Sequence, residues 1–149
     1  MSSANALFNG SITTMTPSIS NDQLAIFIAD DSQIVQERLV TLLDELIGVE
    51  IVGQAESGAN TIKAIRNLHP DAVILDIRMP DGSGLDVLAA IKQDEVTPFI
   101  IILTNYPYPG YREKCLRAGA DYFLDKSTEF DQIPAIIAQF KQDLMTEQD

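Results

Sequence analysis

Short apolar runs along this chain alternate with longer stretches in which apolar residues recur every three or four positions. A short, mostly apolar run bounded by polar or turn-forming residues is typical of a strand buried on both faces. Such runs predict five strands: Leu24–Ala29, Val49–Ala55, Ala72–Leu75, Pro98–Leu103 and Ala120–Leu124. A stretch with helical spacing follows each run, so the pattern predicts five strand–helix units.

The boundaries of the predicted helices come from residues that start or stop a helix. The first helix begins at Ser32 and ends by Gly48, and the second begins at Ser57 and ends before Pro70. A residue that precedes proline avoids the α region, which sets that second boundary. The other three helices are marked by Leu85, Leu88 and Ile91, by the segment from Pro109 to Gly119, and by Ile133, Ile136, Ile137, Phe140 and Leu144. Strands alternating with helices predict an α/β fold, a doubly wound parallel sheet.

Residues 1–22 do not share this pattern. They are rich in Ser, Thr and Asn and contain few large apolar residues, a composition that favours a flexible tail. From residue 23 onward the strand–helix pattern continues to the end, without an internal repeat or a linker. We therefore expect a flexible N-terminal tail over 1–22 and one domain over 23–149.

Composition narrows the class of protein. The chain has 149 residues, 46% of them hydrophobic, which is enough for one core. A formal net charge of -12 disfavours direct binding to nucleic acid. The apolar runs are too short to span a membrane, and the N-terminus lacks the features of a secretory signal. The single cysteine, Cys115, fits a reducing compartment. We expect a cytoplasmic protein that contacts neither nucleic acid nor membrane.

Polar side chains follow the predicted strands at the points where they end. They are Asp30-Asp31, Asp76, Thr104 and Lys126. Carboxyl ends of parallel strands meet at one edge of a sheet, where ligands bind. Two carboxylates about 4 Å apart repel by about 4 kcal/mol at a partly buried site, so Mg²⁺ and a lysine ammonium are natural partners. A carboxylate can also attack phosphorus, while a hydroxyl and an ammonium can bind phosphoryl oxygens.

The order of these residues resembles the receiver domain of two-component response regulators. The resemblance rests on Asp30-Asp31, on Asp76-Ile-Arg-Met-Pro-Asp-Gly-Ser-Gly, on Thr104 and on Lys126, and it covers residues 23–145. It implies a flavodoxin-like receiver fold of the single-domain type, with a five-stranded parallel sheet in the order 2-1-3-4-5 flanked by five helices. It also implies that the protein is no enzyme beyond Mg²⁺-dependent self-phosphorylation from a phosphodonor and self-dephosphorylation.

The resemblance assigns the phosphoacceptor and the metal ligands. Asp76 is expected to accept the phosphoryl group, and Mg²⁺ is the expected cofactor. Asp31 and Asp76 are expected to bind the ion directly and Asp30 mainly through water. The backbone carbonyl of Arg78 is expected to complete the protein ligands.

The resemblance also assigns residues that respond to the phosphoryl group. Thr104 is expected to bond one phosphoryl oxygen and Lys126 another, and Phe123 stands where the family has an aromatic switch residue. Three positions depart from the family pattern. Asn105 follows the threonine where a small residue is usual, Ser127 follows the lysine where proline is common, and Phe123 lacks the hydroxyl of the commoner tyrosine.

The expected function is that of a phosphorylation-controlled signalling module in a phosphorelay. Its phosphodonor would be a sensor histidine kinase or a phosphotransfer protein, and its output would pass through a protein partner or self-association. The alternative is a pseudo-receiver that binds a partner without being phosphorylated. A dehalogenase-type phosphatase is disfavoured because no second acid stands at Arg78, and dinucleotide binding because no glycine-rich turn follows the first strand.

Some of these residues also have purely structural interpretations. Asp30 could in addition cap the first helix, because aspartate is favoured at that position. Phe123 could be a core aromatic instead of a switch. Tyr106, Tyr108 and Tyr111 cluster near the fourth helix, where they either mark a partner site or pack against one another.

Overall fold

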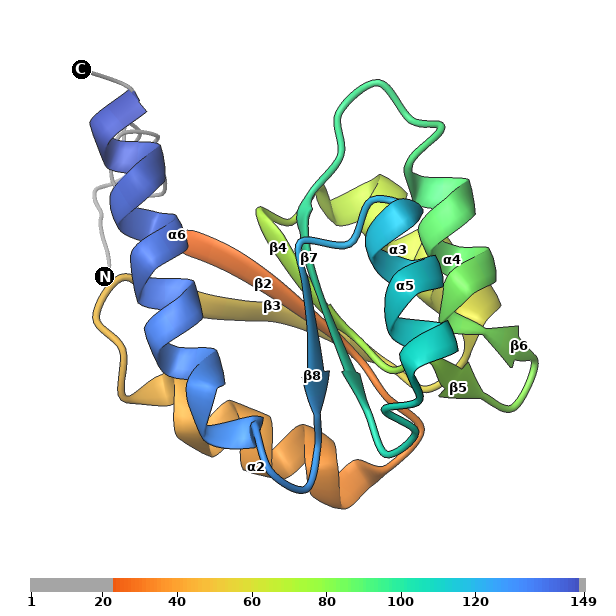
Figure 1. Ribbon diagram of the computed structural model, residues 1–149. Coiled ribbons are helices and arrows are strands. Elements are labelled where there is room, and N and C mark those ends of the chain that lie inside the picture. Colours follow the sequence, from red (N-terminus) through yellow and green to blue (C-terminus); the bar gives the residue numbers. More distant parts are fainter. Residues whose placement is uncertain (1–22, 148–149) are drawn as a thin grey trace.

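The computed structural model describes residues 23–147 and shows a five-stranded parallel sheet with helices on both faces (Figure 1). The strands are β2 (Leu24–Ala29), β3 (Val49–Ala55), β4 (Ala72–Leu75), β7 (Phe99–Thr104) and β8 (Tyr122–Asp125). Their order across the sheet is β3-β2-β4-β7-β8, which is the predicted order 2-1-3-4-5. The chain moves outward in one direction from β2 and in the other from β4, so the switch point of this sheet lies between these two strands.

Within residues 23–147, five helices cover the sheet, as predicted. They are α2 (Gln33–Asp44), α3 (Gly58–Leu68), α4 (Gly84–Ile91), α5 (Pro109–Arg117) and α6 (Ile133–Glu147), and a 3-10 turn, η1 (Phe130–Gln132), precedes α6. Helices α2 and α6 pack on one face and α3, α4 and α5 on the other (Figure 1). Alternate residues of the central strands enter the two cores: Phe27 and Val73 face α3 to α5, whereas Ile26 and Ile74 face α2 and α6.

Several boundaries differ from the sequence-based expectation. Helix α2 ends at Asp44, and the chain turns through Gly48, whose φ is 77°, before β3. Ser32 caps α2, with its Oγ accepting from the Val35 N–H at 3.3 Å, so the interpretation of Asp30 as the N-cap is wrong. The loop expected after Asp76 contains a short antiparallel pair, β5 (Arg78–Met79) and β6 (Gly82–Ser83), which is too short for any periodic signal.

Gly84, the first residue of α4, packs directly against the end of β4. Its N–H donates to the carbonyl oxygen of Ile77 at 2.6 Å. A Cβ at this position would lie 2.8 Å from the Cα of Ile77 and would overlap the carbonyl oxygen of Asp76. Only glycine therefore lets α4 begin this close to the segment that carries Asp76.

Residues 1–22, for which a flexible tail is predicted, lie outside the described part of the chain. Within the described part, no helix has the length and apolar character needed to cross a membrane.

Candidate functional site

Four strands end at one edge of the sheet and bring the predicted polar residues together. The register pairs Ala29 with Leu75, Leu75 with Ile102, and Thr104 with Asp125, so the strand ends are aligned. The residues that follow or end these strands are Asp30 and Asp31 after β2, Asp76 after β4, Thr104 at the end of β7 and Lys126 after β8. The site thus lies at the switch point between β2 and β4, where the strand order reverses.

Lys126 connects two of the carboxylates. Its Nζ lies 2.7 Å from Oδ2 of Asp30 and 3.3 Å from Oδ2 of Asp76. All three side chains are buried, and the Lys126 N–H donates to the carbonyl oxygen of Thr104 at 2.8 Å. Burial alone would lower the pKa of Lys126, but its hydrogen bond to Asp30 and the charges of both carboxylates raise it overall. Lys126 therefore stays a cation and neutralises one of the negative charges.

The negative charge of an ionised Asp76 is only partly offset by its neighbours. Burial, followed by the negative charge of Asp30, raises the pKa of Asp76 from 3.8 to about 6. The charge of Lys126 and the Arg78 N–H, which donates to Oδ1 of Asp76 at 3.2 Å, oppose this rise only in part. A raised pKa means that a charged Asp76 is destabilised in the folded protein, so additional positive charge at this site would be favourable.

The three aspartates are arranged like the ligands of a small cation. One carboxylate oxygen from each of Asp30, Asp31 and Asp76 lies within 4.8 Å of the others, with Asp31 exposed and the other two buried. Opposite ligands of Mg²⁺ lie about 4.2 Å apart, because each Mg–O distance is about 2.1 Å. The triad therefore fits an Mg²⁺ ion held partly through water. With Lys126 present, the ionised site keeps two negative charges, which suits a divalent cation.

Thr104 and Arg78 belong to segments next to Asp76, Thr104 at the end of β7 and Arg78 in β5. Thr104 is fully buried, and its Oγ1 accepts from the Tyr106 N–H at 2.8 Å. Arg78 is exposed, and the central carbon of its guanidinium lies 4.4 Å from the centre of the Tyr106 ring. Asn105, between Thr104 and Tyr106, is exposed. Phosphoryl binding by Thr104 and metal binding by the Arg78 carbonyl remain predictions.

Phe123 lies inside the molecule. Its side chain is 4% exposed and belongs to the core between the sheet and helices α3 to α5. Arg112 Nη1 donates to the Phe123 carbonyl oxygen at 3.2 Å, and the Arg112 guanidinium carbon lies 6.0 Å from the ring centre. A buried position suits both of the roles considered for this residue, core aromatic and switch.

The three tyrosines near α5 contact one another in sequence. The ring centres of Tyr106 and Tyr108 are 6.5 Å apart, and those of Tyr108 and Tyr111 are 5.9 Å apart. Tyr111 also packs against the core, whereas Tyr108 is 60% exposed. Local packing therefore accounts for the cluster in part, and Tyr108 remains accessible.

Sequence reasoning assigned no role to two residues that hold the site in place. Gln36 is buried in α2, and its Nε2 donates to the carbonyl oxygens of Asp30 at 2.7 Å and Ala55 at 3.1 Å. Asp81 accepts from the Gly58 and Ala59 N–H groups at 2.6 and 3.1 Å, and these bonds lower the pKa of Asp81. Gln36 stands three positions before Leu39 and seven before Leu43, on the buried face of α2, and this spacing was the available signal for it.

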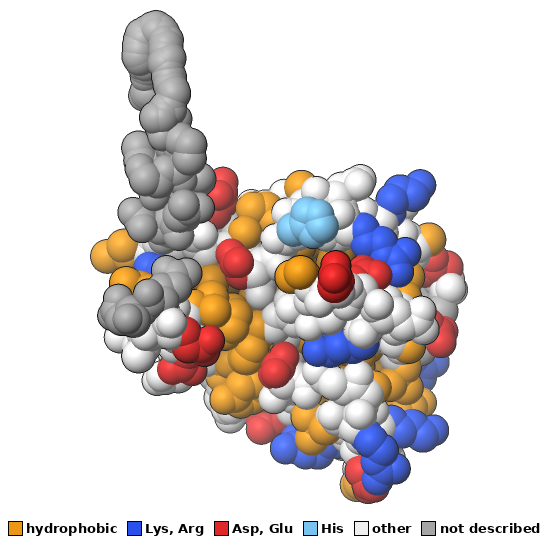
Figure 2. All heavy atoms as spheres, turned by 90° about the horizontal axis from the view of Figure 1, so that it is seen from above, with side chains coloured by type: hydrophobic (Ala, Val, Ile, Leu, Met, Phe, Trp, Pro, Cys, Tyr) orange, Lys and Arg blue, Asp and Glu red, His pale blue; other side chains and the backbone are white. Residues whose placement is uncertain are grey.

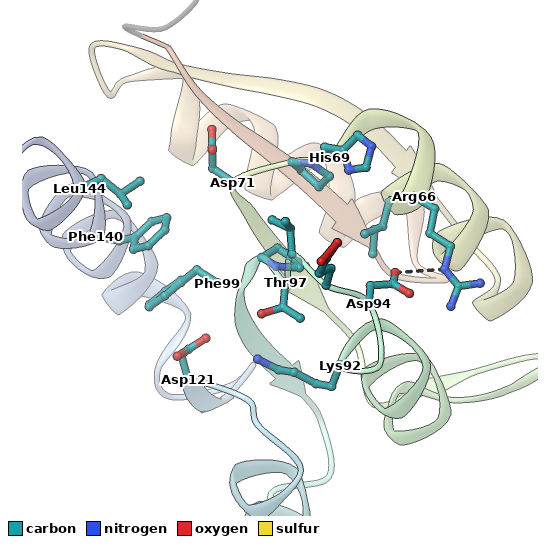
Figure 3. Close-up of a pocket in the computed structure, with 15 residues that line it drawn as sticks. Arg66, His69, Asp71, Lys92, Asp94, Thr97, Phe99, Asp121, Phe140 and Leu144 are labelled. Atoms are coloured by element: carbon teal, nitrogen blue, oxygen red, sulfur yellow. Dashed lines mark hydrogen bonds and ion pairs between the residues drawn. The ribbon is translucent and has the colours of Figure 1, made fainter. Parts of the chain in front are cut away.

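A cavity of about 850 Å³ lies at the opposite edge of the sheet. Figure 3 shows that its lining mixes charged side chains such as Lys92, Asp94 and Asp121 with Phe99 and Phe140. Acidic, basic and apolar side chains are intermixed over this end of the molecule (Figure 2). None of the three clustered aspartates lines this cavity, and neither does Lys126. The candidate functional site is therefore the group of side chains at the carboxyl ends of the strands.

Known proteins resemble most of the chain. The sequence profile of the response regulator receiver domain matches residues 26–138. The transcriptional regulatory protein YvfU of Bacillus subtilis is 37% identical over 110 residues, which cover 74% of this chain and 55% of YvfU. A protein-glutamate methylesterase/protein-glutamine glutaminase of Alkalilimnicola ehrlichii is 32% identical over 119 residues, 78% of this chain and 30% of that protein.

Among solved structures, the signal receiver domain of NarL from Mycobacterium tuberculosis superposes with a TM-score of 0.75 at 26% identity. The match covers 81% of this chain and 98% of that structure. The chain therefore spans about half or less of the curated relatives named above but nearly all of a receiver domain solved by itself.

Proposed function

The chain belongs to the family of response regulator receiver domains, and we propose that residues 23–149 form a receiver that accepts a phosphoryl group on Asp76. The observation that carries the proposal is the contact of Lys126 Nζ with the carboxylates of Asp30 and Asp76, beside Asp31. A nucleophile, a cation and an acidic metal site thus converge at one edge of the sheet. As in its family, no catalytic activity is expected beyond self-phosphorylation and self-dephosphorylation.

Mg²⁺ is the proposed cofactor. When bound, it would supply positive charge to the carboxylates and to the phosphoryl oxygens. Asp31 and Asp76 would hold it directly, Asp30 mainly through water, and the Arg78 carbonyl would complete the protein ligands. Asp31 is exposed and therefore open to an ion, whereas the carboxylate of Asp30 is already engaged by Lys126 at 2.7 Å, and both observations support this division of roles.

The proposed transfer is a substitution at phosphorus. An oxygen of Asp76 forms the new P–O bond while the P–N bond of a phosphohistidine breaks, and the histidine nitrogen leaves with the bonding electron pair. Lys126 already lies 3.3 Å from Asp76 Oδ2, where it would bind a phosphoryl oxygen. The Thr104 hydroxyl would donate to a second oxygen. Asp76 needs no general base, because the attacking oxygen belongs to a carboxylate.

The proposed partners follow from this chemistry. A sensor histidine kinase or a phosphotransfer protein would supply the phosphoryl group, and the signal would leave through a downstream protein or through self-association. The relatives carry the matched region within longer proteins of different description, a transcriptional regulatory protein and a methylesterase/glutaminase. The names of these relatives therefore do not indicate a single output for the matched region.

We also propose a cytoplasmic location and no direct contact with nucleic acid or membrane, as the net charge of -12 and the single cysteine favour.

Labelling with a small phosphodonor tests the proposal. The purified protein is incubated with acetyl phosphate and Mg²⁺, and acyl phosphate is detected by intact mass. We expect one phosphoryl group on the wild type, none on Asp76→Asn and none in excess chelator. Glu95→Gln is the matched control, because Glu95 is an exposed acid beside the cavity at the opposite edge. Labelling that survives Asp76→Asn or chelation contradicts the mechanism, and an unlabelled wild type favours the pseudo-receiver alternative.

A further inference from the structure

Lys126 is the middle residue of a turn that follows β8. The carboxylate of Asp125 bonds across it: one oxygen, Oδ1, accepts from the Ser127 N–H at 2.9 Å and from the Ser127 hydroxyl at 2.7 Å. An aspartate that binds the backbone two residues further on imitates a backbone turn and restrains the residue between. The N–H of that residue, Lys126, donates to the carbonyl oxygen of Thr104 at 2.8 Å, so the turn is also bonded to the end of β7.

Glu129 closes the same turn from its other side. Oε1 of Glu129 accepts from the Asp125 N–H at 2.9 Å, and the Glu129 N–H donates to the Asp125 carbonyl oxygen at 2.8 Å. The backbone and the carboxylate of Asp125 are thus both bonded to residues beyond Lys126. Proline, which is common at the position of Ser127 in the family that the sequence resembles, has no N–H and could not donate to Asp125. In this chain, hydrogen bonds restrain the turn where a proline ring would otherwise do so.

The acceptor in this turn stays charged at neutral pH. The hydrogen bonds from Ser127, first that of its hydroxyl and then that of its N–H, lower the pKa of Asp125 below its ordinary value. Hydrogen bonds to an ionised acceptor are shorter and stronger than those between neutral groups. Ser127 is exposed and Asp125 is half-buried, so these bonds lie nearer to solvent than the side chain of Lys126, which is buried among the carboxylates of the site.

The position of the Lys126 ammonium depends on the backbone of this turn. Lysine has a flexible side chain, so a fixed direction of its Cα–Cβ bond helps to keep Nζ 2.7 Å from Asp30 and 3.3 Å from Asp76. We propose that Asp125 is a positioning residue for phosphoryl transfer, because its turn orients the backbone from which Lys126 reaches the phosphoryl oxygens at Asp76. This inference rests on the proposed function. Asp125 itself forms and breaks no covalent bond in the transfer.

The rate of phosphorylation tests this role. The full chain is mixed with acetyl phosphate at saturating Mg²⁺, and the initial rate of acyl-phosphate formation is followed by intact mass. We expect Asp125→Ala to react about three- to tenfold more slowly than the wild type, the factor expected when one or two hydrogen bonds no longer hold the productive arrangement. Asp125→Asn keeps an oxygen acceptor and should recover to within about twofold of the wild type. The matched control is Asp131→Ala, which removes an exposed aspartate from the same connection and should keep the wild-type rate.

Two further measurements separate positioning from a general effect on the fold. In a Lys126→Met background, which keeps a long side chain without the ammonium, adding Asp125→Ala should change the residual rate by less than about twofold, because no ammonium remains to be positioned. The exchange of the Lys126 ammonium protons with water, followed by 15N NMR, needs no phosphorylation. We expect it to be at least about threefold faster in Asp125→Ala, because a displaced ammonium loses its contacts with the carboxylates, and unchanged in Asp131→Ala.

Each contrary result overturns the positioning role. A wild-type rate in Asp125→Ala, or unchanged exchange of the ammonium protons, would show that the turn does not position Lys126. An equal loss of rate in the Lys126→Met background would show an effect on the fold, and an Asp125→Asn variant as slow as Asp125→Ala would show that the hydrogen bonds are not the cause. With a labelled wild type these results refute the positioning role alone, whereas an unlabelled wild type refutes the proposed function and this role with it.

Discussion

Replacing Asp76 by asparagine should stabilise the metal-free protein, although it removes the proposed phosphoacceptor. Asparagine has the shape of a protonated aspartate but carries no charge. The side chain of Asp76 is only 5% exposed, and its pKa is raised from 3.8 to about 6. The folded protein therefore binds a proton at this position more tightly than the unfolded chain does.

The size and sign of the effect follow from that shift. A rise of about two pKa units corresponds to about 3 kcal/mol, because one unit is about 1.4 kcal/mol. Well below pH 3.8 Asp76 is protonated in both the folded and the unfolded state, so it does not affect the free energy of unfolding. As the pH rises through 3.8 towards 6, Asp76 ionises first in the unfolded chain, so the wild type loses stability that Asp76→Asn keeps. The free energy of unfolding of the variant should exceed that of the wild type by about 1–3 kcal/mol at pH 7.5 and by little at pH 4.

Urea unfolding in the presence of chelator measures this difference. The midpoint should rise at pH 7.5 in Asp76→Asn while the m-value stays unchanged. Glu95→Gln, an exposed acid at the opposite edge, should change the free energy of unfolding by less than about 0.5 kcal/mol. Added Mg²⁺ should stabilise the wild type more than the variant and so reduce the gap. A variant less stable than the wild type at pH 7.5, or equally stabilised at both pH values, would refute the reasoning.

Further predictions concern the parts of the fold that support the site. Gln36→Ala should lower the free energy of unfolding by about 1–3 kcal/mol, measured in urea, because the buried carbonyl oxygen of Asp30 loses the Gln36 donor, whereas that of Ala55 keeps the Asp30 N–H. Gly84→Ala should destabilise by about 1–3 kcal/mol and weaken Mg²⁺ binding measured by titration, because a Cβ overlaps the Asp76 backbone. On phosphorylation, NMR shifts should change along α5, β8 and α6, since a Thr104–phosphoryl bond frees space near Phe123, and changes confined to the strand ends would contradict that route.

The sequence was sufficient for the elements and for the grouping of polar side chains at the strand ends. Strands such as Leu24–Ala29 were found from the sequence because a strand buried on both faces must be apolar along its length, whatever packs against it. The sequence also predicted that Asp30, Asp76 and Lys126 lie close together, because parallel strands end at one edge of the sheet. The periodicity of the chain and the direction of its strands are local properties, and the sequence carries both.

Contacts between loops could not be derived in this way. Arg78, in the short strand β5, and Tyr106, in the loop after β7, are 28 positions apart, and nothing in the sequence pattern of either segment requires them to meet. The burial of Phe123 and the two carbonyl bonds of Gln36 likewise depend on how helices seat on the finished sheet. Such contacts depend on packing between segments that are distant in the sequence. The close approach of Gly84 to the backbone of Asp76, for example, fixes the position of the loop between β4 and α4. The sequence therefore determined which groups the site contains, and the tertiary structure decided which side chains surround them.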